Sequence, residues 1–335
     1  MERESGVQEA GSDAAVHPGH SLVYSSSEFE SLSLPNIGYW MEHMIPKKGI
    51  VLLHGKYGAW KTAIGLNIAK GVAEGNGLWD KKTESTRVLF LECDTPVQAL
   101  QPRAKTLGFS GLSVDFSPAY PGIDVVNPKR DEWNWHRYME LHKLHLDKPY
   151  GLVIIDSLRT IHSMSEKEGE TAKEVYLAAA RMFPDATVLL IHHDRKTSRE
   201  EGNWKSWRSQ EQLETEAESF MGSQRWIDLA TTALKISKHG KQGIVIQQSK
   251  SQWGLISKPI FLVPNGDGVT LTPPATIDDN SIAAAVPVIT KQPIRNLGEL
   301  DRKLAKHFGV SDRYIRNFRI EWEERNGQIP VRSRG

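Results

Sequence analysis

The chain has 335 residues, of which 39% are hydrophobic and 25% are charged, which is the composition of an ordinary globular protein. Its 42 basic and 41 acidic residues give a net charge of +1, so it is not a polycation, and any contact with nucleic acid must come from a local patch. The single cysteine, Cys93, excludes an intramolecular disulfide framework and a cysteine zinc site, and it fits a reducing, cytoplasmic compartment. Apolar runs fall short of the roughly 18–20 residues that cross a bilayer, so no membrane partner is expected.

The N-terminal stretch 1–27 is rich in Gly, Ser, Glu and His and predicts a disordered tail. It contains no apolar stretch of the kind found in secretory signals. The segment 28–273 that follows is expected to form one domain.

Within this domain, apolar runs alternate with amphipathic stretches. Strands are predicted at 50–55, 87–94, 150–157 and 186–194, and helices at 61–75, 96–107, 131–146 and 169–183. Residues 222–237 are predicted to be helical and then extended, and further segments, predicted as antiparallel strands that finish the sheet, lie at 243–249, 258–263 and 268–273. Buried β-branched runs separated by helices predict an α/β fold, a mostly parallel sheet with helices on both faces.

The character of the chain changes after Asp194. Residues 194–219 are almost wholly polar, with charges of both signs and two tryptophans, and a stretch this long without a core pattern is either a functional loop or disordered. The proline-containing stretch 274–293 predicts a linker, and 294–335 predicts a separate, all-α unit.

A candidate phosphate-binding loop, GKYGAWKT, lies between the first strand and its helix. Gly55 begins the signature G-x-x-x-x-G-K-[ST], and Lys61 and Thr62 end it. Trp60 replaces the final glycine, at a position that often needs a backbone conformation that glycine adopts most easily. Gly58 inside the loop relieves part of this problem. The alternative is a strand–turn–helix with an incidental Lys-Thr pair.

Two predicted strands end in carboxylates. Asp156 follows four apolar residues, the Walker B pattern that places a carboxylate beside a bound metal. Glu92 ends the neighbouring run and is suited to deprotonate an attacking water, with Asp94 as a rival for that role. The alternatives are a helix cap for Asp156 and a solvated strand end for Glu92.

Two consecutive histidines, His192 and His193, end the fourth strand. Facing the same crevice, they are expected to contact the γ-phosphate or its water. A zinc site is not expected, because further ligands at metal spacing are missing nearby.

Taken in order, these motifs resemble the RecA-like P-loop ATPases, in particular the hexameric replicative helicases of plasmids and phages. The resemblance covers roughly residues 35–273 and implies ATP and Mg²⁺ as cofactors, with Thr62 and Asp156 holding the metal. It assigns Glu92 as the catalytic base, His193 as the sensor, and Lys61 to the phosphates. The nucleotide-binding residues that it implies are Gly55, Gly58, Ala59, Trp60, Lys61 and Thr62.

The same resemblance implies a homo-oligomer, a hexameric ring, in which a basic finger reaches the neighbouring site. The candidates for this finger are Arg225, Lys235 and Lys238. The polar loop after Asp194 would face the ring channel, where Lys196 and Lys205 are candidates for contact with single-stranded DNA. Solvated surface charge is the alternative for each of these cations.

The C-terminal segment predicts a helix-turn-helix. An apolar stripe precedes Gly309, and Ser311 is placed to cap a second helix. Residues 291–335 contain 11 basic and 6 acidic residues, a local charge of +5. Arg313 and Arg316 lie early on the second helix, where a recognition helix meets duplex DNA. A protein-docking helical hairpin is the alternative.

These features predict an ATP-hydrolysing DNA motor, a ring-forming helicase or translocase acting in replication or repair of a plasmid- or phage-like element. An ATP-gated DNA-binding regulator or loader with weak turnover is the alternative, with Trp60 as its mark. A filament-forming recombination ATPase is a third possibility.

Overall fold

The computed structural model describes residues 23–32, 38–194, 224–239, 243–274, 285–289, 296–308, 315–316, 319–320 and 323. The chain divides into two units, Met1–Ile37 and Gly38–Gly335. In the first unit, Ser25 caps helix α1 (Ser26–Ser31) through a capping box with Glu28. This helix includes residues 26 and 27, the last two of the stretch that was expected to be a tail.

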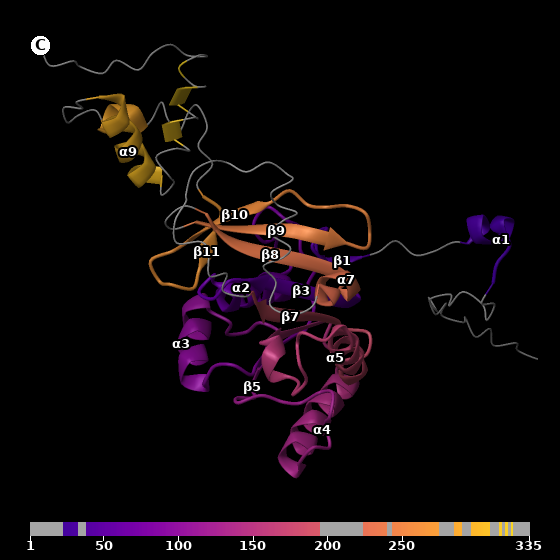
Figure 1. Ribbon diagram of the computed structural model, residues 1–335. Helices are drawn as coiled ribbons and strands as arrows, with labels where there is room; N and C mark the ends of the chain where they lie inside the picture. The colour runs from indigo at the N-terminus through magenta and orange to yellow at the C-terminus, as the bar shows by residue number, and fades with distance from the viewer. Residues whose placement is uncertain are drawn as a thin grey trace, which may run out of the picture. The chain divides into compact units, whose positions relative to one another are not determined.

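In the second unit, nine strands of the described chain form one sheet, in the order β11-β10-β9-β8-β3-β7-β6-β4-β5 (Figure 1). The parallel strands are β3 (Gly49–Gly55), β4 (Val88–Glu92), β5 (Val114–Pro118), β6 (Leu152–Asp156), β7 (Thr187–His193) and β8 (Thr232–His239). The antiparallel strands that follow are β9 (Gly243–Ser251), β10 (Ile260–Pro264) and β11 (Leu271–Thr272). The predicted mixed sheet is confirmed.

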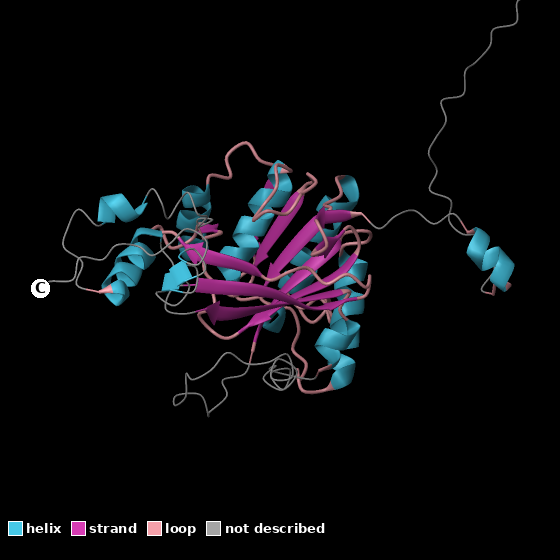
Figure 2. Ribbon diagram, turned by 90° about the horizontal axis from the view of Figure 1, so that it is seen from above, coloured by secondary structure: helices cyan, strands magenta, loops and turns pink. Residues whose placement is uncertain are grey.

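Helices cover both faces of this sheet (Figure 2). The helices of the domain are α2 (Lys61–Glu74), α3 (Val97–Leu107), α4 (Glu132–Asp147), α5 (Gly169–Met182) and α7 (Arg225–Leu229), with a 3₁₀ turn η1 (Leu158–Thr160) after β6. One hydrophobic cluster joins α2 and α3 to one face, and a second joins α4, α5 and α7 to the other. Within β3, Val51 and Leu53 belong to the first cluster and Ile50 and Leu52 to the second, as strand alternation requires.

Three strands were not predicted from the sequence. Strand β5 lies at the edge of the sheet, and its residues are half-buried or exposed. It therefore has no apolar run like those of the central strands. The short strands β1 (Tyr39–Met41) and β2 (Ile45–Pro46) form a separate antiparallel ribbon before the P-loop strand. Strand β5 has no apolar run to signal it, and β1 and β2, at three and two residues, are too short to show the period of a strand.

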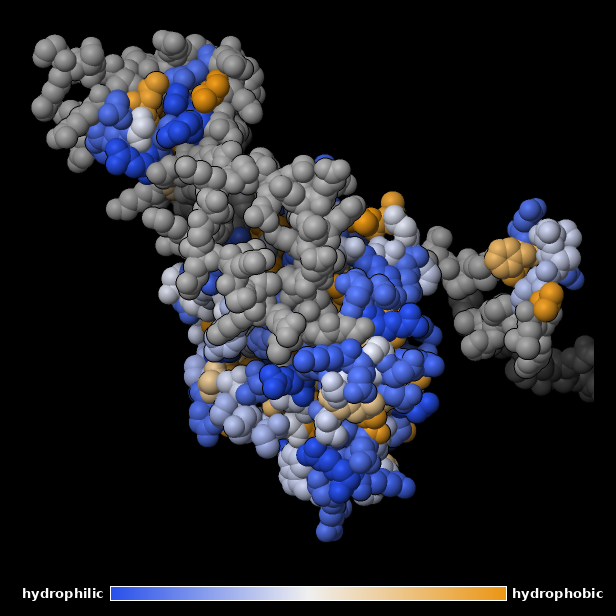
Figure 3. Space-filling view, viewed as in Figure 1, coloured by the Kyte–Doolittle hydropathy of each residue, from blue (hydrophilic) through white to orange (hydrophobic). Residues whose placement is uncertain are grey.

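Hydrophilic side chains cover most of the described surface on the face drawn in Figure 3. No helix within the described part of the chain combines the length and the apolar character needed to cross a bilayer. Towards the C-terminus, residues 285–289 are helical inside the predicted linker, and α9 (Leu297–Phe308) forms the first helix of the predicted C-terminal unit.

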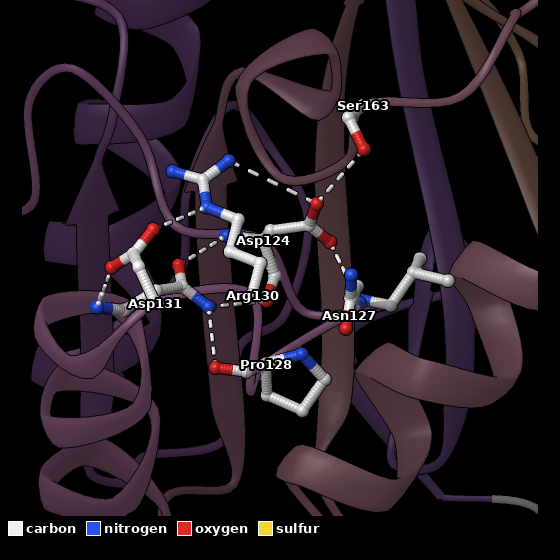
Figure 4. A network of polar contacts seen from close by, with 8 residues as sticks. Asp124, Asn127, Pro128, Arg130, Asp131 and Ser163 are labelled. Carbon is white, nitrogen blue, oxygen red and sulfur yellow. Dashed lines mark hydrogen bonds and ion pairs between the residues drawn. The ribbon is translucent and has the colours of Figure 1, made fainter.

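A buried polar network fixes the loop between β5 and α4 (Figure 4). Asp124, which is 2% exposed, accepts hydrogen bonds from the backbone of Asn127 and from the hydroxyl of Ser163. Asn134, on α4 and fully buried, accepts from the Asp124 amide and donates to the carbonyls of Asp124 and Pro128. The network therefore ties this loop to the segment that leaves the strand ending in Asp156.

We expect Asn134→Ala to lower the free energy of unfolding by about 2–4 kcal/mol, because it leaves the buried amide and carbonyl of Asp124, and the half-buried carbonyl of Pro128, without their partner. Chemical denaturation measures the change. His136→Ala is the matched control on the same helix, since its side chain is 78% exposed, and it should change stability by no more than about 0.5 kcal/mol. Equal effects of the two substitutions would contradict the role given to the network.

Candidate nucleotide-binding site

The P-loop connects β3 to α2. At Trp60 it adopts the backbone conformation that the sequence analysis expected to favour glycine. Trp60 lies at φ 64° and ψ 20°, in the left-handed region, and Gly58 has φ 70°. A tryptophan therefore occupies a conformation that costs an L-residue roughly 1–2 kcal/mol and costs glycine little. The half-buried Trp60 ring packs against the cluster beneath α2, which offsets part of this cost. The loop therefore keeps the backbone that a glycine would adopt here, although the residue is a tryptophan.

Close packing under the loop explains the glycine that begins it. A side chain at Gly55 would approach the carbonyl oxygen of Ile236, on β8, to 2.6 Å. The loop ends where α2 begins, and Trp60 gives the helix no side-chain cap. The first backbone N–H groups of α2 therefore remain available to an anion, as at other phosphate-binding helix ends.

Lys61 lies inside the loop. It is 5% exposed, and its Nζ donates to the carbonyls of Gly55 and Lys56, each at 2.8 Å. Burial lowers the pKa of Lys61 to about 8, although the charges of Asp194, Asp156 and Asp94 oppose this shift. The carbonyls of the loop thus hold the ammonium of Lys61 inside the loop.

The structure brings together the side chains of Thr62 and Asp156. The Thr62 hydroxyl donates to Oδ2 of Asp156 at 2.6 Å, and Asp156 is 3% exposed at the end of β6. Burial raises the pKa of Asp156 to about 6. A hydroxyl and a carboxylate at the mouth of a phosphate loop form the all-oxygen donor set that Mg²⁺ prefers, so these two residues fit the ion. When bound, Mg²⁺ would neutralise charge on the phosphates.

Glu92 lies beside Asp156 on the neighbouring strand, with the two residues paired in register. It is fully buried, and its Oε1 accepts from the backbone N–H of Asp94 at 3.0 Å and of Thr95 at 2.8 Å. Its Oε2 has no hydrogen-bond partner among the described residues. Burial, and then the charge of Asp156, raise the pKa of Glu92 to about 7. One oxygen is therefore fixed, and the other is left to accept a proton near neutral pH. Asp94, the rival, has a half-exposed side chain.

The two histidines at the end of β7 do not face the same crevice, and that prediction was wrong. His193 lies on the nucleotide side, with Nε2 3.9 Å from Oδ2 of Asp94 and its ring centroid 6.0 Å from that of Tyr57. His192 is 1% exposed and stacks on Trp226, 6.2 Å away, in the cluster on the other face. Successive strand side chains point to opposite faces, so adjacent histidines cannot share a site. Burial and the charge of Lys61 lower the pKa of His193.

Sequence reasoning missed two features at this edge of the sheet. His54 and Asp194 form a buried pair, with Nδ1 2.9 Å from Oδ1, and the Asp194 amide donates to the carbonyl of Gly55. Tyr57, which is 78% exposed on the P-loop, lies over His193. The available signal was the sequence His-His-Asp at the end of a strand that pairs with the P-loop strand.

The candidates for the finger toward a neighbouring subunit and for DNA binding lie in several parts of the chain. Arg225 begins α7, and Lys235 and Lys238 lie on β8. Nε of Arg316 lies 3.5 Å from Oδ2 of the buried Asp301. The remaining candidates lie outside the described residues and are Lys196, Lys205 and Arg313.

Residues 23–199, just over half of the chain, match the family model AAA_25, described as an AAA domain. The chain belongs to the AAA_25 family. Together with the sheet order and the P-loop geometry, membership of this family confirms the predicted RecA-like P-loop core. This AAA_25 protein is an ATPase that uses ATP and Mg²⁺. None of the curated proteins matches it.

Solved structures similar to this AAA_25 protein include three of low sequence identity. One, described as an ATPase domain, is 11% identical with a TM-score of 0.47, and the match covers 68% of this chain and 85% of that one. The RadB recombinase is 14% identical with a TM-score of 0.42, covering 67% and 90%. A DnaB-like replicative helicase, described together with its interactions with primase, is 12% identical with a TM-score of 0.48, covering 73% and 66%.

The raised pKa of Glu92 predicts a dependence of stability on pH in the chain free of nucleotide and magnesium. The folded-state pKa of about 7 lies above the ordinary value of 4.5, so the folded state resists an ionisation that the unfolded chain accepts. The folded state is stabilised relative to the unfolded state while Glu92 is protonated in both, which holds below pH 4.5. This contribution to stability is lost as the pH rises through 7. Since glutamine does not ionise, Glu92→Gln should melt higher than wild type by a margin that grows to about 2–4 °C over this window. Thermal unfolding at about pH 5, 6, 7 and 8 measures it, and a margin that shrinks with rising pH would contradict the assignment.

Proposed function

We propose that this AAA_25 protein is an ATP-driven DNA motor, a ring-forming helicase or translocase that acts in the replication or repair of a plasmid- or phage-like element. The observation that carries this proposal is the nucleotide site described above, joined in one chain to a basic C-terminal segment. Residues 291–335 carry 11 basic and 6 acidic residues, whereas the whole chain is nearly neutral at +1. Local positive charge of this kind is what binding to the phosphate backbone requires.

The hydrolytic half of the proposal assigns a role to each residue at the carboxyl ends of the strands. Glu92 takes the proton of the attacking water through Oε2, while its other oxygen stays fixed on backbone amides. Lys61 pairs with the phosphates, and Thr62 and Asp156 hold the magnesium ion. His193, between Asp94 and Tyr57, senses whether the terminal phosphate is present.

The DNA-binding half of the proposal has support from contacts within the C-terminal segment. Arg319 donates to both carboxylate oxygens of Asp301 on α9, at 2.6 and 3.2 Å, and both residues are buried. Leu304 of α9 and Ile315 are fully buried. A two-pronged ion pair between the first helix and residue 319 favours a packed helical pair of the helix-turn-helix kind. In this proposal, Arg313 and the 58%-exposed side chain of Arg316 meet duplex DNA.

In the proposed hexameric ring, single-stranded DNA passes through the channel and contacts Lys196 and Lys205. Arg225 and Lys235 are the proposed fingers toward the neighbouring subunit. Arg225 is the first residue of α7, which follows the polar loop in the chain. In this proposal, DNA in the channel would contact the loop, and the nucleotide of the neighbouring subunit would contact Arg225.

One observation favours a second candidate function, the ATP-gated regulator or loader with weak turnover. Trp60 holds the strained φ of 64°, and Lys61 is engaged with the loop's own carbonyls. A stiff loop of this kind would bind nucleotide and release or hydrolyse it slowly. The two candidates differ in the rate at which ATP is turned over.

The motor proposal predicts ATP hydrolysis that single-stranded DNA stimulates and that Lys61→Ala abolishes, a loss of at least about 100-fold since the lysine pairs with the transferring phosphate. Steady-state phosphate release with and without DNA measures it. Lys258→Ala, which changes an exposed lysine after β9, is the matched control and should hydrolyse as wild type. If the wild-type chain does not hydrolyse ATP either with or without DNA, the motor proposal is wrong.

Trp60→Gly distinguishes the two candidate functions. If the chain is a motor with a tolerated loop variant, Trp60→Gly should hydrolyse ATP within about twofold of wild type, because the glycine adopts the same backbone at little cost. Trp60→Ala is its control, since it loses the same ring and keeps a Cβ at positive φ. A tenfold or greater rise in turnover for the glycine variant alone would instead show that the tryptophan acts as a brake, and would favour the regulator.

A further inference from the structure

Strand β8 extends beyond the end of the P-loop strand. The last paired residues of β3 and β8 are Gly55 and Ile236, after which β3 turns into the P-loop. Strand β8 continues to His239, paired on its other edge with β9. Residues 237–239 therefore run alongside the phosphate-binding loop.

Alternation along β8 decides which side chains turn toward that loop. Leu234 and Ile236 belong to the hydrophobic cluster on the α2 face, and Ala233 belongs to the cluster on the other face. Lys238 follows Ile236 by two residues and so faces α2 and the loop, whereas Lys235 faces away. The two lysines of this strand are therefore not equivalent.

The distance agrees with this arrangement. A Cβ added at Gly58, in the middle of the P-loop, would lie 4.0 Å from Nζ of Lys238, and no other described heavy atom outside Gly58 and its two chain neighbours would lie so close. Lys238 is exposed, and it forms no hydrogen bond or ion pair with the described residues. A second ammonium, besides that of Lys61, is thus held beside the loop and remains available to an anion.

We propose that Lys238 binds the triphosphate of the nucleotide held by its own subunit. The sequence made Lys238 a candidate finger toward a neighbouring subunit, and the structure instead favours action within one chain. An added cation at this place supplements the P-loop where Trp60 replaces the usual glycine. The proposal rests on the nucleotide site alone and is independent of DNA binding.

Binding of a fluorescent, non-hydrolysable ATP analogue, measured without DNA, tests the contact. Lys238→Ala should weaken binding about tenfold, the size expected for one charge-assisted hydrogen bond at an exposed site, with the melting temperature unchanged. Lys238→Arg should recover most of the affinity, because it keeps the charge. Lys258→Ala is the control and should bind as wild type. Wild-type affinity in Lys238→Ala, or an equal loss in Lys258→Ala, would overturn the proposal.

Mixing two defective chains tests whether Lys238 acts within its own subunit. Lys61→Ala chains have a damaged loop and an intact Lys238, and Lys238→Ala chains have the reverse. If Lys238 serves its own loop, equimolar mixtures have no complete site, and binding of the analogue stays at the mean of the two variants. Recovery toward the wild-type level would show that Lys238 reaches a neighbour's loop and would overturn action within one chain. Since DNA is absent, either result leaves the DNA-motor proposal to its own test.

Discussion

Two buried carboxylates on neighbouring parallel strands determine the arrangement of the nucleotide site. Glu92 and Asp156 are paired in register at the ends of β4 and β6, and both are almost fully buried. Burial raises the pKa of both groups, and the charge of Asp156 raises that of Glu92 further, so the fold holds them at a cost in stability. Thr62 donates to Asp156, and backbone amides donate to Glu92. The positions of α2 and of the turn after β4 follow from these contacts, because each must bring a donor to a carboxylate.

The P-loop keeps its shape although Trp60 replaces its usual final glycine. Trp60 keeps the backbone that a glycine would adopt, and its ring packs on the cluster beneath α2. The phosphate cradle is therefore preserved in shape, with Lys61 buried inside it. Close approach of β8 requires Gly55, and the same approach brings Lys238 to the loop. The strand that supports the loop thus also supplies a charge to it.

Strand β7 connects the two faces of the sheet. His193 lies beside Tyr57 of the P-loop, while His192 stacks on Trp226, which also stacks on His162 at 5.9 Å. The next residue, Ser163, is bound to Asp124 of the buried network. A continuous set of packed rings and hydrogen bonds therefore runs from the end of β7 to the loop after Asp156.

Local sequence patterns were sufficient for the chemistry of the site. The runs that end in Glu92 and Asp156, and the loop that ends in Lys61 and Thr62, carry their own signals, because a buried strand, a strand-end carboxylate and a helix start are local features. The conflict at Trp60 was also visible, since it depends on the backbone of a single residue. The sequence therefore determined an α/β fold with a P-loop and an acidic pair.

Only the tertiary structure decided how residues distant in sequence are placed beside one another. Edge strand β5 lacks an apolar run, so its place in the sheet depends on pairing with β4. Which of the two histidines, His192 or His193, faces the P-loop depends on which faces α2 and α5 cover. The position of Lys238 depends on the register of β8 with β3 and on how far β8 continues. Register and face are set by packing across the whole sheet, and for that reason no short stretch of sequence contains them.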